Sequence, residues 1–218
     1  MLPDLPGKSA QLIMAPTQRV AELLDTKNPP ADAKCSAVLV LLRANNYNWD
    51  LLLIERSKYN GHHSAQIAFP GGKCEKNDKS HADTALREAN EEIGITPNKC
   101  YLIGELTQIY VPGSNFIIHP VLAVAEDLDD IEMQINHKEV VSTKWIPLKD
   151  LNPQEAKTIK VLRSNNEWSD APAFIYEDYT VWGATAMILA ELYQFVMPEA
   201  ISRMFFKRPY ISSSNPEI

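Results

Sequence analysis

The order of hydrophobic and polar positions predicts a chain of paired strands with a few helices. Two compact apolar runs, CSAVLVLL (35–42) and LLLIER (51–56), flank the polar turn RANNYNWD and predict a β-hairpin. Segments 101–111 and 116–126 are rich in β-branched and aromatic residues around the turn PGSN, which predicts a second strand pair. Segment 139–151 predicts a strand entering a short helix, and segment 182–196 predicts a helix.

The same pattern divides the chain into three parts. Residues 9–25 fit one or two short amphipathic helices broken near Ala15 and Pro16, and DTKNPPADAK is typical of a linker. We therefore expect an N-terminal helical extension (1–33), a main domain (34–200) and a polar C-terminal tail (201–218). Strands on both sides of a central helix, with another helix near the end, predict an α/β fold, an α/β/α sandwich with a mixed β-sheet.

Composition narrows the class of partner. A length of 218 residues with 45% hydrophobic content fits one globular domain with extensions. The net charge of -7 offers no basic surface, so no nucleic-acid partner is expected, and no apolar run suggests a membrane partner. Cys35, Cys74 and Cys100 are odd in number and lack a CxxC pair, which indicates neither a disulfide framework nor a zinc pattern and favours a cytoplasmic location.

An acidic helix carries the most specific chemistry. Ser80 is a plausible N-cap, apolar residues then recur at helical spacing and Gly94 can provide the C-cap, so we expect a helix at about 81–93. At about 100° per residue, Glu91 and Glu92 lie about 60° and 40° to either side of Glu88. All three carboxylates therefore share one face.

Oxygen ligands of this kind suit Mg²⁺ or Mn²⁺, which keep other positions for water and substrate phosphate. Taken alone, the same three residues fit a solvated helix face equally well, because this is the usual fate of a run of charges. The rest of the segment decides between these two interpretations.

The segment REANEEIGI resembles the Nudix box, whose pattern is G-x5-E-x7-R-E-U-x-E-E-x-G-U with U an aliphatic residue. Counting from Gly72, the first half departs from the pattern: Asp78 takes the first acidic position, and the spacer to Arg87 is one residue longer. The second half matches in register at Arg87, Glu88, Ala89, Glu91, Glu92, Gly94 and Ile95.

The resemblance implies hydrolysis of a nucleoside diphosphate linked to another moiety, by water that Mg²⁺ or Mn²⁺ activates. It implies Glu88 and Glu92 as the principal metal ligands, the carbonyl of Gly72 as a further contact, and Glu91 as another ligand or as the general base. Arg87 is expected to orient a carboxylate. Some relatives take the base from a later loop; Glu139 is then the residue to name, with the acidic run 126–130 in competition, although both fit solvated loop positions.

A second resemblance, upstream of the box, is to the coenzyme A pyrophosphatase subgroup, whose signature is approximately LLTxR[SA]xxxRxxxGxxxFPGG. Arg56, Ser57 and the FPGG run from Phe69 match, whereas Gly61 replaces the subgroup's second arginine and Ala65 replaces its glycine. The expected substrate contacts are Arg56, Gln66 and Ser114. The adjacent His62 and His63 are expected on the surface, and Phe69 and Trp182 are expected in the core.

The sequence thus predicts a pyrophosphohydrolase of coenzyme A or acyl-CoA that yields 3',5'-ADP and 4'-phosphopantetheine. ADP-ribose or a nucleoside-diphosphate sugar is the alternative substrate. A module that senses a nucleotide without cleaving it is the alternative class. The expected partner is a small-molecule nucleotide, and the resemblance also allows a homodimer.

Overall fold

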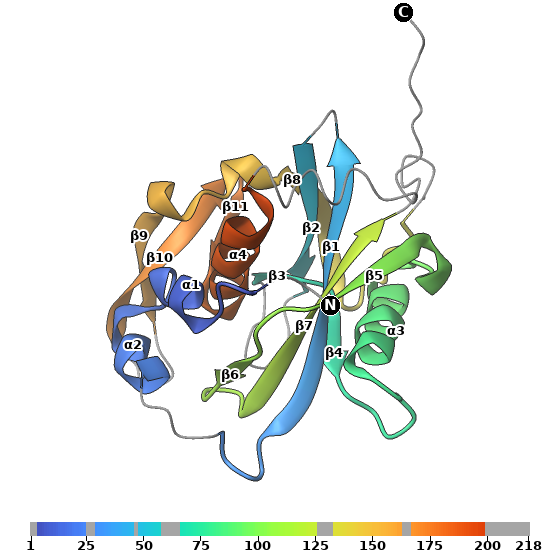
Figure 1. The fold of residues 1–218 in the computed structure, drawn as a ribbon, viewed down its shortest axis with the longest axis horizontal. Helices are drawn as coiled ribbons and strands as arrows, with labels where there is room; N and C mark the ends of the chain where they lie inside the picture. The colour runs from blue at the N-terminus through green and yellow to red at the C-terminus, as the bar shows by residue number, and fades with distance from the viewer. Residues whose placement is uncertain are drawn as a thin grey trace, which may run out of the picture.

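The computed structural model describes residues 4–24, 29–45, 48–57, 66–125, 133–162 and 167–198. The strands of its main sheet are β1 (Lys34–Asn45), β2 (Asn48–Arg56), β3 (Ile67–Ala68), β4 (Gly71–Lys73), β5 (Cys100–Glu105), β6 (Ile109–Val111), β7 (Phe116–Ala125) and β8 (Val140–Pro147). The main path is β3-β2-β1-β7-β5, while β4 pairs with β1, β6 with β7 and β8 with β2 (Figure 1). Because β1 runs parallel to β7 and antiparallel to β2, the sheet is mixed.

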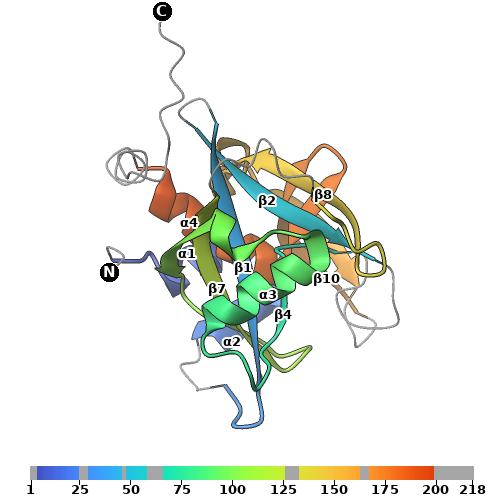
Figure 2. The ribbon, with the colours of Figure 1, turned by 90° about the vertical axis from the view of Figure 1, so that its right-hand side faces the viewer.

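Helices cover both faces of this sheet. Helix α3 (His81–Ile93) lies on one face, and α1 (Lys8–Ile13) and α4 (Gly183–Val196) lie on the other (Figures 1 and 2). Side chains of β1 alternate between the two buried layers, since Leu39 packs on the α3 side and Val40 packs on the α4 side. A strand buried on both faces has to be apolar throughout, which explains the run at 35–42. The predicted α/β/α sandwich with a mixed sheet is confirmed.

Most predicted elements are present with small changes of boundary. The hairpin is β1-β2, the strand at 139–151 is β8 followed by the short 3₁₀ helix η3 (Leu148–Asp150), and the helix at 182–196 is α4. The predicted strand at 101–111 is divided into β5 and β6, which both pair with β7. A second, three-stranded sheet was not predicted; it contains β9 (Lys157–Leu162), β10 (Trp168–Tyr176) and β11 (Tyr179–Trp182).

The N-terminal segment forms the two expected short helices, α1 and α2 (Thr17–Leu24), with the break at Ala15 and Pro16. Helix α1 packs on α4 around a buried carboxylate, that of Glu191. Glu191 accepts hydrogen bonds from Gln11 Nε2 at 2.9 Å and from Thr107 Oγ1 at 2.6 Å. A buried charge needs such donors, so these contacts hold the N-terminal segment against the sheet.

The expectation about the cysteines is wrong for two of the three. Cys35 and Cys74 form a disulfide, whereas Cys100 is free. The antiparallel pairing of β1 with β4 brings Cys35 opposite Cys74, and Cys74 N donates to Cys35 O at 3.1 Å. Pairing between strands 39 positions apart leaves no trace in local spacing, which is why the sequence did not indicate it.

Within the described ranges, no helix combines the length and the apolar character that crossing a membrane requires.

Candidate metal-dependent active site

Helix α3 forms as its end signals predict. The Ser80 hydroxyl accepts from Asp83 N at 3.1 Å, and Gly94 ends the helix with φ 74°, a conformation that favours glycine. Ala85, Ala89 and Ile93 are fully buried against the sheet. Their packing fixes the rotation of the helix, and with it the direction of the carboxylates on the neighbouring face.

Glu92 is the most buried of these carboxylates, with 0% of the residue exposed. Its Oε2 accepts from Gly71 N at 2.9 Å, and its Oε1 lies 3.1 Å from Arg56 Nη1 without forming a hydrogen bond. Burial raises the pKa of Glu92 to about 7, although Arg56 and the Gly71 N–H oppose this shift. Glu92 is thus a buried acid with one oxygen that has no hydrogen-bond donor.

Glu88 lies one turn earlier on the helix and approaches the glycine pair of β4. A Cβ placed on Gly72 would lie 2.3 Å from Glu88 Oε2, and one on Gly71 would lie 2.4 Å from Ala37 O. Gly71, which has φ 153° and meets backbone atoms, therefore requires glycine, whereas a side chain on Gly72 would displace the Glu88 carboxylate. Burial also raises the pKa of Glu88, against the opposing effect of its hydrogen bond from Arg87.

Arg87 connects the helix to the loop before it. Its Nε and Nη2 each donate to the Asp78 carboxylate at 3.1 Å, and Nη2 also donates to Lys73 O at 3.1 Å. Its Nη1 donates to Glu88 Oε1 at 2.8 Å and lies 3.4 Å from Glu91. The forked bond from Arg87 holds the pKa of Asp78 well below its usual range, and Asp78 in turn raises the pKa of Arg87.

Asp78 takes the place of the glutamate in the family pattern and is one residue farther from Arg87. It binds Arg87 through the forked hydrogen bond. The pairing closes the loop 74–80 in spite of its extra residue. Asp78 also accepts from Glu75 N and from Thr84 Oγ1, so the loop is fastened to the first turns of the helix.

The remaining predicted acids lie nearer to solvent. The Glu91 side chain is 55% exposed, and its contact with Arg87 is a long one. Glu139 is exposed, yet its charge contributes to the raised pKa values of both Glu88 and Glu92, so it lies within electrostatic reach of both. The competing acidic run 126–130 lies outside the described residues.

A cavity of about 470 Å³ lies next to residues that contact Glu88 and Glu92, but none of the four predicted glutamates is among its described lining residues. Arg56, Gly71 and Gly72 line it and also contact Glu92 or Glu88. Each predicted substrate contact also lines this cavity: Arg56, Gln66 and Ser114. The volume is in the range of small-molecule sites, and much of the wall is apolar, with Val38, Phe69, Ile118 and Trp182 among its residues. Phe69 is almost fully buried, as expected, but it also forms part of this wall.

Sequence reasoning missed the part of the wall that comes from the N-terminal segment. Pro16 and Arg19, at the start of α2, line the cavity, and Arg19 Nη2 donates to Tyr110 O. Nothing in the local sequence of α2 points to this role, because it depends on the packing of α1 against α4. The predicted surface residues His62 and His63, together with Gly61 and Ala65, lie outside the described residues.

The chemistry of the donor set fits a hard divalent cation. Burial raises the pKa of both Glu88 and Glu92, a Cβ built on Gly72 would meet the Glu88 carboxylate, and Glu92 Oε1 is buried and accepts no hydrogen bond from the described residues. Carboxylates that carry raised pKa values because they are buried gain most from a nearby cation. No such benefit would arise for a helix face surrounded by water.

Gly72→Ala is expected to lower activity by about 10- to 100-fold, because the added methyl group would displace the Glu88 carboxylate. Turnover at saturating Mg²⁺ and the thermal midpoint of unfolding are the measurements. Gly113→Ala, in the wall of the same cavity, is the control for adding a methyl group that displaces no carboxylate, since its Cβ would meet no atom within 4 Å. Equal activity of the two variants would contradict a role for the close approach at Gly72.

Comparisons with known proteins agree with this geometry. The family model described as NUDIX domain matches residues 33–164. The human protein named mitochondrial coenzyme A diphosphatase NUDT8 is 32% identical over 149 residues, which cover 68% of this chain and 63% of that protein. The chain thus spans less than two thirds of the human protein. The mouse protein of the same name is 31% identical over 194 residues, covering 86% of this chain and 88% of the mouse protein.

A solved structure supports the fold. The MutT/nudix family protein from Enterococcus faecalis has a TM-score of 0.50 and is 16% identical, with 92% of this chain and 78% of that chain covered. Because the family model matches more than half of the sequence, and the elements that carry its motif are in place, the chain belongs to the Nudix hydrolase family.

Proposed function

We propose that this protein hydrolyses the pyrophosphate bond of coenzyme A or acyl-CoA with Mg²⁺ or Mn²⁺, giving 3',5'-ADP and a 4'-phosphopantetheine product. One observation carries the proposal: the carboxylates of Glu88 and Glu92 approach Gly72 and Gly71, and these two glycines line a largely apolar cavity of about 470 Å³. A diphosphate has to meet the carboxylates, while the organic groups on either side occupy the apolar part of the cavity.

Each residue near the carboxylates has a proposed task. Glu88, Glu92 and the carbonyl of Gly72 hold the cation, and Glu91 adds a contact from the exposed side. When bound, the cation lowers the pKa of water and neutralises charge on the phosphate oxygens. Arg87 holds Glu88 in place through a hydrogen bond from Nη1. Its Nε and Nη2 donate to Asp78, and Nη2 also donates to Lys73 O.

Glu139 is proposed as the general base. It is exposed to solvent, and its backbone carbonyl accepts from Ser57 N at 2.8 Å, which joins its loop to the end of β2. A base of this kind needs access to water and a position near the carboxylates, and Glu139 combines both.

Arg56 is proposed as a diphosphate contact. Its Nη1 lies 3.1 Å from Glu92 Oε1 and donates to Gly71 O at 3.3 Å, so Arg56 also forms an ion pair at the end of β2. Since Arg56 also lines the cavity, its remaining donors are available on the substrate side.

The names of the human and mouse relatives support coenzyme A over other nucleotides. The test is direct: purified protein with Mg²⁺ is incubated with coenzyme A, with ADP-ribose and with a sugar nucleotide, and the products are separated by chromatography. We expect 3',5'-ADP from coenzyme A at the highest kcat/KM, and loss of product with Glu92→Gln. Preference for ADP-ribose would reject the substrate, and no turnover of any compound would favour a sensor.

Cation binding is expected to depend on pH through Glu92. Its pKa of about 7 means that it is largely protonated below neutrality, whereas a metal ligand has to be ionised. Affinity for Mn²⁺ should therefore fall by up to about tenfold per pH unit below pH 7 and level off above it. The electron paramagnetic resonance signal of free Mn²⁺ measures this affinity.

Arg56→Ala provides the internal control for that profile. Arg56 lowers the pKa of Glu92, so its removal should move the transition to higher pH. An affinity that stays constant between pH 6 and 8 would argue against Glu92 as a ligand.

A further inference from the structure

The Cys35–Cys74 bond belongs to a second group of metal-binding side chains, on the other side of β1 from the cavity. Ser36 lines the cavity, and side chains alternate along a strand, so Cys35 faces the α3 side. His119 on β7 faces the same side, because it lies next to Ala37 in the parallel register and Ala37 packs on the α3 side. His81 is the first residue of α3.

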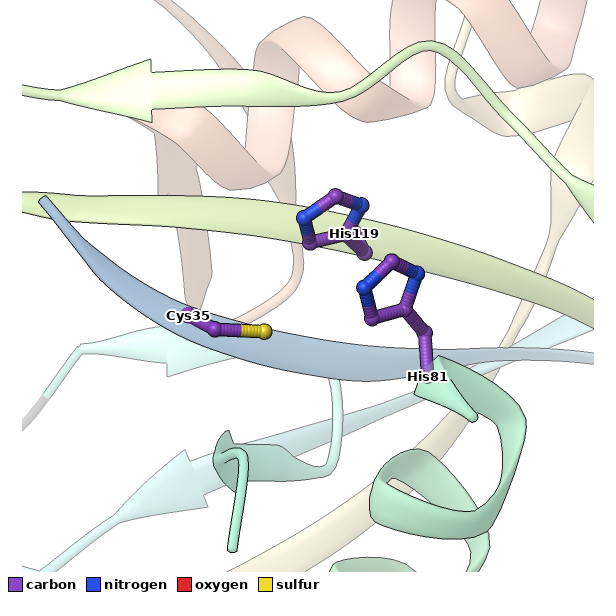
Figure 3. Close-up of side chains that lie close together, drawn as sticks. All are labelled: Cys35, His81 and His119. Carbon is purple, nitrogen blue, oxygen red and sulfur yellow. The ribbon is translucent and has the colours of Figure 1, made fainter. Parts of the chain in front are cut away.

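The two imidazole rings stack with their centroids 3.5 Å apart and an angle of 17° between their planes. Cys35 Sγ and one nitrogen from each ring lie within 4.8 Å of one another. Figure 3 shows one nitrogen of each ring directed to the side where Cys35 lies, and the other nitrogen directed away. A cysteine sulfur and imidazole nitrogens are the ligand types that Zn²⁺ takes in structural sites.

The carboxylate of Glu105 lies near the Nδ1 atoms of both histidines. Its carboxylate is 3.1 Å from His81 Nδ1 and 3.8 Å from His119 Nδ1. A carboxylate accepts from an N–H, so the hydrogen bond with Glu105 favours the proton of His81 on Nδ1 and leaves its lone pair on Nε2. Histidines that bind zinc are commonly held by a carboxylate in this way.

We propose that Cys35, Cys74, His81 and His119 bind one Zn²⁺ ion in tetrahedral geometry once the Cys35–Cys74 bond is reduced. A thiol or phosphine reductant supplies two electrons, the sulfur–sulfur bond breaks, and each sulfur takes one proton. Both thiols then release their protons as zinc–sulfur bonds form. Two sulfurs on a tetrahedral ion lie about 3.8 Å apart, so Zn²⁺ bridges the strands that the disulfide joins.

This Cys₂His₂ set differs in chemistry from the carboxylate site. Thiolate and imidazole favour Zn²⁺, whereas the oxygens of Glu88 and Glu92 favour Mg²⁺. With the disulfide intact, neither sulfur is a thiolate and only the two histidines remain as strong ligands. The oxidation state of Cys35 and Cys74 therefore decides whether the ion is held.

The test uses the full chain with Co²⁺ as a spectroscopic substitute for Zn²⁺, under anaerobic conditions and with excess Mg²⁺ to saturate the carboxylate site. In protein reduced with a phosphine, we expect one Co²⁺ per chain, a thiolate-to-cobalt charge-transfer band in the near ultraviolet and the visible bands of a tetrahedral ion. Added Zn²⁺ should abolish them. In oxidised protein, the charge-transfer band should be absent.

Four variants locate the signal. Cys74→Ser and His81→Ala should weaken Co²⁺ binding at least tenfold, whereas Cys100→Ser and Glu92→Gln should leave the band unchanged. Because His81 is partly exposed, the His81→Ala chain should keep its fold, and circular dichroism checks this directly. No band in reduced protein, or a band that survives both ligand substitutions, would overturn the proposal. If reduced protein loses its fold, recovery with Zn²⁺ supports the proposal and no recovery overturns it.

Discussion

Glu92→Gln is expected to lower turnover at least about 100-fold at saturating Mg²⁺. The amide oxygen of glutamine can still accept from Gly71 N, but the substitution removes the negative charge that we propose holds the cation. The buried Oε1, which has no hydrogen bond, is the atom whose loss should matter most. Steady-state kinetics with coenzyme A measure the loss of turnover, and Mn²⁺ titration measures the loss of cation affinity.

The stability of this variant should change by less than about 2 kcal/mol. On the sequence alone, Glu92 is a member of an exposed acidic face, and its replacement would touch no core contact. The structure places it in full burial instead. Glutamine keeps its volume, loses the ion pair with Arg56, and relieves the burial of a charge, so two opposing effects nearly balance.

The controls are other glutamates. Glu91→Gln, on the exposed side of the same helix, should reduce turnover less than Glu92→Gln. Glu155→Gln, in the 3₁₀ helix η4 (Pro153–Glu155), should leave turnover unchanged. If Glu92→Gln kept more than half of wild-type activity, Glu92 could not be a principal ligand.

Arg87→Lys is expected to lower both activity and stability although it keeps the charge. Arginine makes a forked contact with Asp78 while it also donates to Glu88 and Lys73 O, and a single ammonium group cannot reproduce this set. We expect turnover to fall about tenfold or more and the free energy of unfolding to fall by about 1–3 kcal/mol. Chemical denaturation and steady-state kinetics are the measurements.

Arg43→Lys is the matched control. Arg43 makes a similar contact with buried Asp50 near the far end of β1, and both arginines have comparable exposure. It should lower stability without a specific loss of turnover. Equal losses of activity in both variants would show that Arg87 acts through overall stability alone.

The pH dependence of the free energy of unfolding at acid pH tests the ion pair between Arg87 and Asp78. Because Arg87 depresses the pKa of Asp78, the pairing stabilises the fold above the ordinary aspartate value of 3.8 and is lost progressively as the pH falls below it. The difference in stability between wild type and Arg87→Lys should therefore narrow in acid. If the difference in stability between the two proteins did not depend on pH, the effect of Arg87→Lys would come from side-chain packing and not from the ion pair.

Elements with strong local signals could be predicted from the sequence. Helix α3 has a side-chain N-cap, an apolar stripe and a C-cap glycine, and each signal acts within a few residues. The hairpin β1-β2 has apolar runs on either side of a polar turn. The grouping of Glu88 and Glu92 follows from helical geometry, so the core of the candidate site could also be predicted.

Features that depend on distant pairing could not be predicted. Cys35 meets Cys74 only because β4 adds to the side of β1. Glu92 is buried only because Gly71 and Arg56 arrive from other strands. The arrangement of His81 beside His119 needs both the parallel register of β7 and the position of α3.

Part of the cavity wall comes from residues beyond both edges of the family match. Arg19 precedes residue 33, and Trp182 and Ile188 follow residue 164. A shorter protein cut at those edges would keep Glu88, Glu92 and the glycine pair but would lose much of the surface that touches the organic part of a ligand. Such a fragment would be a poor guide to selectivity, because its chemistry would persist while its discrimination between ligands would not.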